Sequence, residues 1–324
     1  MKASVNTRYG PPEVLQIKDV IKPIPKDNEV LIKVRASTVN RTDTGFRDPA
    51  YLAVRVVGGF FKPKNPILGT ELSGDVEEIG KDVKTFKIGD SVFGLKCFHF
   101  GAHAEYICVP EEGSIALKPQ HISYEEAAAS SEGPWFALTG LKKMQLKKGD
   151  KILINGGTGS IGSAAIQLAK YFGAEITAVA NTKNLELVKS LGAHMVTDYT
   201  KQDFTKTLNP NSFDFIFDAV GKSSFFKCKK LLKPGGIYYS TELGYMSQNI
   251  FLALFTPLTG GKKVIFPIPK DKKEDILFFK KLIESGHYKA VIDRIYSLDQ
   301  IVEATRYVET KEKTGNVVIK ICSE

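Results

Sequence analysis

The chain has 324 residues, of which 43% are hydrophobic and 25% charged, so it is long and apolar enough for two domains with buried cores. No run of 18 apolar residues occurs and the first 17 residues lack a continuous apolar segment, so we expect neither a membrane span nor a secretory signal. The net charge is +9, but the lysines are spread along the chain, which is typical of solvated faces and gives no expectation of nucleic-acid binding.

The first hundred residues predict antiparallel β structure. Residues 30–40 (VLIKVRASTVN) alternate like a strand with an exposed edge, and residues 72–80 and 88–94 are strands punctuated by glycine. Residues 315–321 (GNVVIKI) are a further strand at the other end of the chain. The simplest assembly is an irregular β domain built from both chain ends, residues 1–119 and 266–324, with a second domain, residues 120–265, inserted.

A glycine-rich stretch, ILINGGTGSIG (152–162), opens the inserted domain. Residues 150–154 predict a buried strand, 163–173 a helix and 174–180 a second strand. Glycines in the pattern G-x-G-x-x-G between such elements are typical of dinucleotide binding, because amide groups at the start of the helix then face a pyrophosphate. A tight turn without a ligand is the alternative, and it would need fewer glycines.

The end of the second strand predicts which nicotinamide cofactor binds. An acid there would bond the ribose 2′-hydroxyl and favour NAD. The stretch VANTKN (179–184) has no acid, and Asn181, Thr182 and Lys183 suit a 2′-phosphate. We therefore expect NADP(H).

Strands and helices continue to alternate after this point. Helices are predicted over residues 184–193 and 223–232, strands over 194–199, 213–221 and 237–241, and a turn over 233–236. The fold class is α/β, a doubly wound parallel sheet of the Rossmann type. Because ligands bind at the carboxyl ends of such strands, Val220, Gly221 and residues 241–244 are expected to face the cofactor.

Two late apolar segments suggest contacts. Residues 249–258 (NIFLALFTPL) are too short to span a bilayer and read as a wall of the substrate cleft, a dimer contact or a membrane-surface contact. Residues 237–241 or 262–266 end the sheet, and an unpaired edge of this kind predicts a homodimer.

At this point the chain resembles a known family along its whole length. The stretches YGPPEVL (9–15), VNRTD (39–43), LGTELSGDVEEIG (68–80), GAHAEY (101–106) and the glycine loop are similar to the medium-chain dehydrogenase/reductase superfamily. Within it the chain is most similar to the quinone oxidoreductase (zeta-crystallin-like) branch. The resemblance implies a GroES-like β domain, a Rossmann domain and an active site between them.

Whether this chain can bind zinc depends on the residues at the positions of the family's zinc ligands. Zinc-dependent members of the superfamily carry cysteine where this chain has Asn40 and histidine where it has Thr70. Neither residue is a good zinc ligand, so we expect no metal. A rival cluster, Cys97, His99 and His103, matches a loop that binds no metal in the family.

The resemblance also implies catalytic residues. It places Asn40, Arg47 and Tyr51 near the nicotinamide, where Asn40 can bond a substrate oxygen or the ribose and Tyr51 can donate to a developing enolate. Arg47 and Asp43 could instead pair with each other.

The cofactor residues implied by the family pattern lie along the second domain and the last strand. Two departures occur where relatives touch the cofactor, at Gly133–Pro134 and at Gly315–Asn316. The expected cofactor-binding residues are Gly156, Gly157, Thr158, Gly159, Ser160, Ile161, Asn181, Thr182, Lys183, Tyr199, Val220, Thr241, Leu243, Gly244, Phe266, Pro267, Ile268 and Asn316.

The leading hypothesis is a zinc-independent, NADPH-dependent reductase of quinones or α,β-unsaturated carbonyls with a small hydrophobic substrate. An enoyl-thioester reductase is the second. A third is an NADPH-binding protein that acts through RNA or membrane partners, which the charge of +9 motivates. Four cysteines without CxxC spacing indicate a reducing, cytoplasmic setting.

Overall fold

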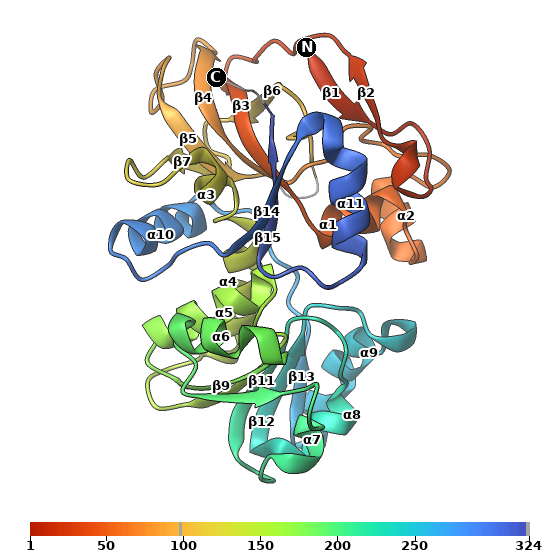
Figure 1. Cartoon of the computed structure of the whole chain (residues 1–324), viewed down its shortest axis with the longest axis vertical. Coiled ribbons are helices and arrows are strands. Elements are labelled where there is room, and N and C mark those ends of the chain that lie inside the picture. Colours follow the sequence, from red (N-terminus) through yellow and green to blue (C-terminus); the bar gives the residue numbers. More distant parts are fainter. Residues whose placement is uncertain (97–98, 322–324) are drawn as a thin grey trace. The chain divides into compact units, whose positions relative to one another are not determined.

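The computed structural model describes residues 1–96 and 99–321, and the chain divides into two compact units (Figure 1). The first unit joins Met1–Glu132 to Asp271–Glu324, and the second is Gly133–Lys270. The sequence expectation puts the domain boundaries at 119/120 and 265/266, and as a division into domains it stays a prediction.

The first unit is built on a seven-stranded sheet with strand order β14-β15-β3-β4-β5-β7, in which β6 also pairs with β3, and on a separate β1-β2 ribbon. Its elements are β1 (Lys2–Val5), β2 (Gln16–Asp19), β3 (Glu29–Val39), α1 (Arg41–Arg47), α2 (Leu52–Gly58), β4 (Glu71–Ile79), β5 (Ser91–Leu95), β6 (Tyr106–Pro110), β7 (Ile115–Leu117), α3 (Tyr124–Ala128), α10 (Lys273–Glu284), β14 (Ile292–Ser297), α11 (Ile301–Glu309) and β15 (Asn316–Lys320).

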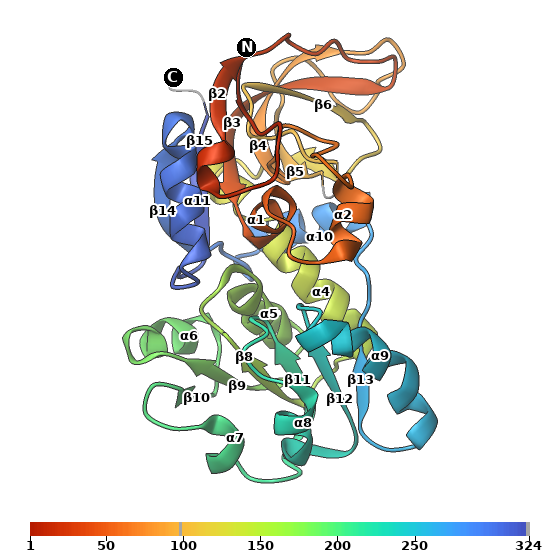
Figure 2. The same ribbon diagram turned by 90° about the vertical axis from the view of Figure 1, so that its right-hand side faces the viewer.

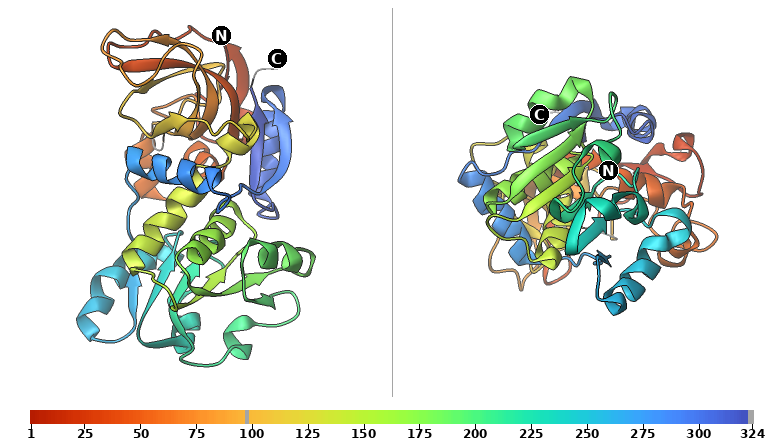
Figure 3. Two further views of the ribbon diagram at one scale, coloured as in Figure 1. Left: turned by 90° about the vertical axis from the view of Figure 1, so that its left-hand side faces the viewer. Right: turned by 90° about the horizontal axis from the view of Figure 1, so that it is seen from below.

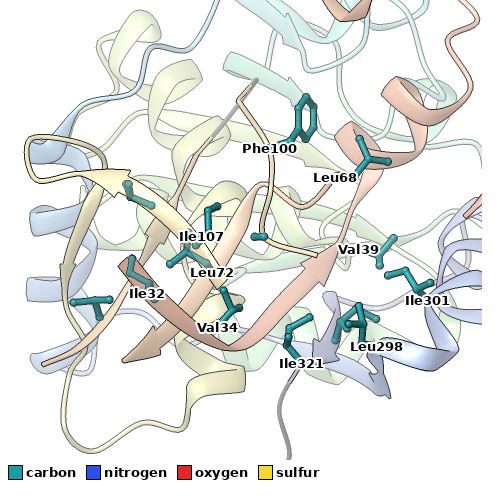
Figure 4. Close-up of a cluster of buried hydrophobic side chains, with 14 of the residues drawn as sticks. Ile32, Val34, Val39, Leu68, Leu72, Phe100, Ile107, Leu298, Ile301 and Ile321 are labelled. Carbon is teal, nitrogen blue, oxygen red and sulfur yellow. The ribbon is translucent and has the colours of Figure 1, made fainter. Parts of the chain in front are cut away.

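Strand β3 lies at the centre of this sheet. Along one edge it pairs with β4, and along the other it pairs first with β6 and then with β15. Ile32, Val34 and Val39 are buried in a core that also takes side chains from β4 and α11 (Figure 4). The expectation of an exposed edge for residues 30–40 is therefore wrong, because alternation along the strand reports its faces and not its edges.

The second unit holds a six-stranded parallel sheet with strand order β10-β9-β8-β11-β12-β13. Numbered along the unit, this order is 3-2-1-4-5-6, the doubly wound arrangement. The elements are α4 (Glu132–Met144, which begins at the last residue before the unit), β8 (Lys151–Asn155), α5 (Ser160–Tyr171), β9 (Glu175–Ala180), α6 (Leu185–Leu191), β10 (Met195–Asp198), α7 (Phe204–Thr207), β11 (Phe213–Asp218), α8 (Phe225–Cys228), β12 (Leu232–Ser240), α9 (Gln248–Phe255) and β13 (Lys263–Ile265).

Helices cover both faces of this sheet (Figure 3). On one face, Ile216 and Tyr238 pack with Phe225 of α8. On the other, Gly140 of α4 lies so close to Tyr239 that an added Cβ would be 2.5 Å from its ring. Alternate residues of the strands thus serve two layers, which explains why the strand sequences are apolar throughout.

The sequence and the structure differ around the start of β12. The helix expected over 223–232 is short and continues as a 3₁₀ turn, and Leu232 already belongs to the strand. The predicted turn at 233–236 lies inside β12, where the register against β11 shifts between Phe213 and Phe215. A glycine pair tolerates such a bulge, so the turn signal here marks a bulge.

Strand β13 forms one edge of the sheet, beside α9 (Figure 2). Helix α9 buries Asn249 and packs Leu252 and Ala253 on the core, while Phe251, Leu254 and Phe255 are exposed. Which contact this face makes stays a prediction. Within the described part of the chain, no helix is long and apolar enough to cross a membrane.

Two cysteines lie within the described ranges as free thiols, Cys108 and Cys228. Burial raises the pKa of each thiol to about 11.

Candidate active site

The strand order of the second unit reverses between β8 and β11, which is where a ligand binds in this class of sheet. Asn155 and Asp218 end these two strands, and Asn155 Nδ2 donates to Asp218 Oδ1 at 3.0 Å. The same carboxylate accepts from the backbone N–H groups of Val220 and Gly221 and from the Tyr238 hydroxyl. Asp218 thus shapes the loop after β11.

The glycine loop fits a pyrophosphate. Gly156 has a φ of +80°, and Gly162 packs so tightly that an added Cβ would lie 2.0 Å from the Gly156 carbonyl oxygen. Gly159 is the N-cap of α5, and no side chain caps this helix start. The first N–H groups of α5 therefore have neither a helical nor a side-chain acceptor, which suits an anion.

The segment after β9 lies where the adenosine ribose is expected. Lys183 is exposed, and Tyr199 is 53% exposed after β10. Thr182 donates its hydroxyl to Asp198 Oδ2 at 2.5 Å, so Asp198 takes the hydrogen that was expected to serve the cofactor. Asn181 Oδ1 accepts from Asn184 Nδ2, which leaves the Asn181 amide group to donate.

The remaining expected cofactor residues have different surroundings. Val220 covers Gly156, and Thr241, Leu243 and Gly244 follow the carboxyl end of β12 and are half-buried. Phe266 and Pro267 are half-buried and Ile268 is exposed, all after β13. Asn316 lies in the first unit and is buried, and its Nδ2 donates to the Val291 carbonyl.

Asn40, at the end of β3, is the N-cap of α1, and its amide is almost fully used. Oδ1 accepts from the Asp43 N–H at 3.0 Å, which fixes the orientation of the amide. Nδ2 then donates to Thr70 Oγ1 at 2.7 Å and to Glu132 Oε2. Both amide hydrogens are taken, so Asn40 can accept one further hydrogen bond but cannot donate to a substrate oxygen in this arrangement.

Glu132 and its neighbours form a buried polar group that we call the Glu132 cluster. Glu132, 4% exposed, accepts at Oε2 from Asn40 and Thr70 and at Oε1 from Thr42, whose Oγ1 is 2.5 Å away. Burial raises the pKa of Glu132 well above its usual value, and the nearby carboxylates Glu71 and Asp43 raise it further. The cluster consists of Asn40, Thr42, Thr70, Glu71 and Glu132.

Glu71 is held differently from Glu132. It accepts from the backbone N–H groups of Ser131 and Glu132 and from the Thr38 hydroxyl. Burial raises the pKa of Glu71, and these hydrogen bonds oppose that effect. Lys313 is a cation that interacts with both carboxyl groups, and burial lowers its pKa to about 8 against the opposing charges of Glu71 and Glu132.

The positions compared with zinc ligands are occupied by this network. Asn40 and Thr70 bond to each other and to Glu132. Of the rival cluster, Cys97 lies outside the described residues, and His103 Nε2 is 2.8 Å from the Thr38 carbonyl oxygen. Across residues 1–96 and 99–321, no group of three His, Cys, Asp or Glu residues is arranged to hold a metal ion.

The other implied catalytic residues lie on α1 and α2. Tyr51 precedes α2 and is 38% exposed. Arg47 is buried and bonds to Glu309 and to the Gly10 carbonyl oxygen. Asp43 accepts instead from the N–H groups of Asn40 and Gly69. The suggested pairing of Arg47 with Asp43 is therefore wrong, and the expected place of Arg47 near the nicotinamide stays a prediction.

The sequence alone did not identify three residues of the site, Thr42, Glu132 and Asp218. Asp218 had a signal, since it is an acid at the end of an apolar strand before a glycine. Glu132 had one too, because it is an acid between small apolar residues and a buried helix. Thr42 lies within the stretch VNRTD (39–43), but nothing in that stretch shows that its side chain meets Glu132.

One unit holds a doubly wound sheet with an uncapped glycine loop and the other a β sheet with a buried polar cluster, a combination typical of nicotinamide-dependent oxidoreductases. Residues 26–120 match the family model described as alcohol dehydrogenase GroES-like domain, and residues 191–319 match zinc-binding dehydrogenase. The chain belongs to the medium-chain dehydrogenase/reductase superfamily and resembles its quinone oxidoreductases.

Similar proteins agree on reductase chemistry. A 2-methylene-furan-3-one reductase from Solanum lycopersicum is 37% identical, over 98% of this chain and 79% of the relative. A chloroplastic NADPH-dependent alkenal/one oxidoreductase from Arabidopsis thaliana is 34% identical over the same shares. The solved quinone oxidoreductase from Coxiella burnetii is 29% identical, with a TM-score of 0.89 over 99% of both chains.

Proposed function

We propose that this protein is a zinc-independent, NADPH-dependent reductase of α,β-unsaturated carbonyls or quinones. The observation that carries the proposal is the Glu132 cluster, in which Asn40 and Thr70 are bonded to a carboxyl group at the positions compared with zinc ligands. Relatives named as alkenal/one, methylene-furanone and quinone oxidoreductases support the same chemistry.

The residues of the second unit fit a dinucleotide. The glycine loop would hold the pyrophosphate, with the N–H groups of Ser160 and Ile161 facing it. Lys183 and the Asn181 amide would bind the 2′-phosphate, since β9 ends without an acid and Asp198 is occupied by Thr182 and Thr200. When bound, the cofactor supplies a hydride.

A conjugated acceptor suits this site better than a simple ketone. Reduction of a ketone needs its oxygen strongly polarised, for which metal-dependent relatives use a Lewis acid. A conjugated carbonyl spreads the charge into an enolate, which a hydrogen bond from a hydroxyl such as that of Tyr51 can stabilise. The exposed aliphatic side chains of α2, Leu52 and Val56, are consistent with a hydrophobic substrate.

The test compares an enone with the corresponding saturated ketone under the same NADPH concentration. We expect turnover of the enone and about 100-fold less of the ketone, as the loss of a preorganised electrostatic contribution implies. Equal turnover of the enone and the ketone would contradict the proposal. An enoyl thioester, added as a third substrate, tests the second hypothesis, that the protein is an enoyl-thioester reductase.

We further propose a homodimer that extends the parallel sheet across β13, and a cytoplasmic location. The edge position of β13 and the exposed apolar residues of α9 support the dimer. Replacing Ile265 of β13 with lysine should give a monomer in sedimentation, whereas Met195→Lys on the opposite edge strand should not. Some relatives are named as chloroplastic or mitochondrial, so the location needs its own measurement.

A further inference from the structure

The second unit has a groove at the end of its sheet that lies opposite the glycine loop. Its volume is about 640 Å³, within the range of about 300–1,000 Å³ that is usual for ligand pockets. Of the residues that line it, Asn211 precedes β11 and Lys262 precedes β13, so both lie at the amino ends of parallel strands. The nucleotide is expected at the carboxyl ends, and the six residues of β11 span roughly 15–20 Å between the two ends. The groove is therefore separate from the nucleotide site, and all of its lining belongs to one unit.

Helices α8 and α9 supply apolar walls of this groove, which we call the α8–α9 groove (Figure 2). Phe225 and Phe226 come from α8 and Leu252 from α9. Phe226 is 65% exposed, so a large aromatic surface in the groove faces water. Gly235, in the bulge of β12, also lines the groove, and a Cβ added to it would meet no atom within 4 Å. The bulge thus borders open space in which a hydrocarbon chain could lie.

The polar groups with remaining hydrogen-bonding capacity gather around Lys262. Its Nζ donates to Asn211 Oδ1 at 3.0 Å and to the Lys229 carbonyl oxygen at 2.9 Å, so one of its three hydrogens is left for a ligand. Asn211 accepts at Oδ1, so its Nδ2 is the donor that it can offer. The hydroxyls of Thr256 and Thr259 donate to backbone carbonyls instead. The groups left at this end of the groove are donors, which suit an acceptor.

Two positive charges in the groove lack an acidic partner. Within residues 1–96 and 99–321, neither Lys229 nor Lys262 forms an ion pair, whereas Lys233 pairs with Asp214. Lys229 Nζ lies 5.8 Å from the centre of the Phe225 ring, so the charge adjoins the apolar wall. A ligand complementary to this surface carries a negative charge next to an apolar body.

We propose that the α8–α9 groove binds the carboxylate form of a medium- or long-chain aliphatic acid. The carboxylate accepts from Lys262 and Asn211 with Lys229 as the second cation, and the chain covers Phe226 and Leu252. A carboxylate has one charge and two oxygens, which matches these few donors better than the three oxygens of a phosphate group do. The proposal needs neither the cofactor nor the reaction, so it goes beyond the proposed function and does not depend on it.

Calorimetric titration of the full chain with dodecanoate tests the charge preference. We expect dodecanoate to bind, and dodecyltrimethylammonium, which has the same chain and the opposite charge, to bind about 10-fold more weakly or less. Equal binding of the two would overturn the proposal, because a merely apolar surface does not distinguish their charges. NADPH should leave dodecanoate binding unchanged. Competition between the two would place the acid in the nucleotide site and would also overturn the proposal.

Three lysine variants locate the carboxylate. Lys229→Met and Lys262→Met keep an unbranched side chain but remove the charge, and each should weaken dodecanoate binding about 10-fold. Lys230→Met is the matched control, since Lys230 is exposed beside Lys229 but does not line the groove. It should bind dodecanoate as the wild type does. Equal affinities in all three variants would place the acid elsewhere and overturn the proposal.

Gly261→Trp tests the apolar part of the groove. An added Cβ at Gly261 would meet no atom within 4 Å, and its φ is not positive, so we expect the melting temperature to hold while dodecanoate binding is lost. If the melting temperature falls, the lysine variants decide. A second copy of the chain is the other candidate occupant. A wild-type dimer that ignores dodecanoate, and that Gly261→Trp converts to a monomer in sedimentation, would assign the groove to that copy and overturn the proposal.

Discussion

Asn155 Nδ2 lies 3.0 Å from Asp218 Oδ1, so one side-chain hydrogen bond joins the ends of the two strands between which the sheet order reverses. Asp218 has no exposed surface and accepts five hydrogen bonds in all, two of them from the loop residues Val220 and Gly221. The carboxylate therefore holds the loop after β11, where we propose that the cofactor binds.

Asp218→Asn should destabilise the second unit, because one of the two oxygens that accept hydrogen bonds becomes a donor. We expect a loss of about 1–3 kcal/mol in the free energy of unfolding and weaker cofactor binding. Asp214→Asn is the matched control, since Asp214 is on the same strand but forms a partly exposed ion pair with Lys233. Denaturant titration measures the free energy of unfolding of both variants. An equal decrease of that free energy in the two would contradict the role of Asp218.

The glycine loop predicts two separable effects. Gly162→Ala places a Cβ 2.0 Å from a carbonyl oxygen and should cost about 1–3 kcal/mol of stability. Gly159→Ala meets nothing closer than 3.9 Å at an ordinary φ of −72°, so stability should hold while NADPH binding weakens. Melting temperatures and calorimetric titration measure the two effects. Unchanged NADPH affinity in Gly159→Ala would place the pyrophosphate elsewhere.

Lys183→Glu should weaken NADPH binding by about 1–3 kcal/mol and leave NADH nearly unaffected, because only the 2′-phosphate would meet the charge. Lys189→Glu, six residues further along the chain on α6, serves as the control; Lys189 pairs with Glu186 and is not expected to meet the 2′-phosphate. Dissociation constants for both nucleotides are the measurement. Wild-type protein that binds the two equally would refute the assignment of NADPH.

Glu132→Gln should be more stable than the wild type at neutral pH. The raised pKa of Glu132 means that above about pH 4.5 the unfolded chain releases a proton that the folded protein keeps, so wild-type stability falls as pH rises toward the folded pKa. The difference in melting temperature between variant and wild type should therefore grow with pH above about 4.5. Glu186→Gln, on an exposed side chain, should show no such trend, and a constant difference for Glu132→Gln would contradict the raised pKa.

The fold was largely predictable, because its signals are local. Strands β8 and β9 and helix α5 follow from short apolar runs around the glycines, and each begins or ends within a few residues of expectation. The edges of β3 were not predictable, since alternation says which face is buried but not which strands lie alongside. The bulge at 233–236 consists of the residues KPGG, which also favour a turn, so the sequence predicts a turn there.

The candidate site was predictable only in part, for a physical reason. Glycines and the absence of an acid are visible in one segment, whereas the Glu132 cluster gathers residues about 30 and 90 positions apart. Asn40 is expected to bond a substrate oxygen or the ribose, and because its amide hydrogens go to Thr70 and Glu132, only its oxygen is left to accept such a bond. Hydrogen-bond saturation depends on all partners at once and cannot be read from a single stretch.

The two thiols within the described residues, the half-buried Cys108 and the buried Cys228, bear on chemical durability. Conjugated carbonyls add to thiolates, so a protein that handles them risks covalent modification by its own substrates. Since burial raises the pKa of Cys108 and Cys228 to about 11, few of these groups are ionised at neutral pH. Both side chains should therefore resist alkylation for as long as the surrounding strands and helix remain folded, and transient opening of these elements would set the rate at which the protein is inactivated.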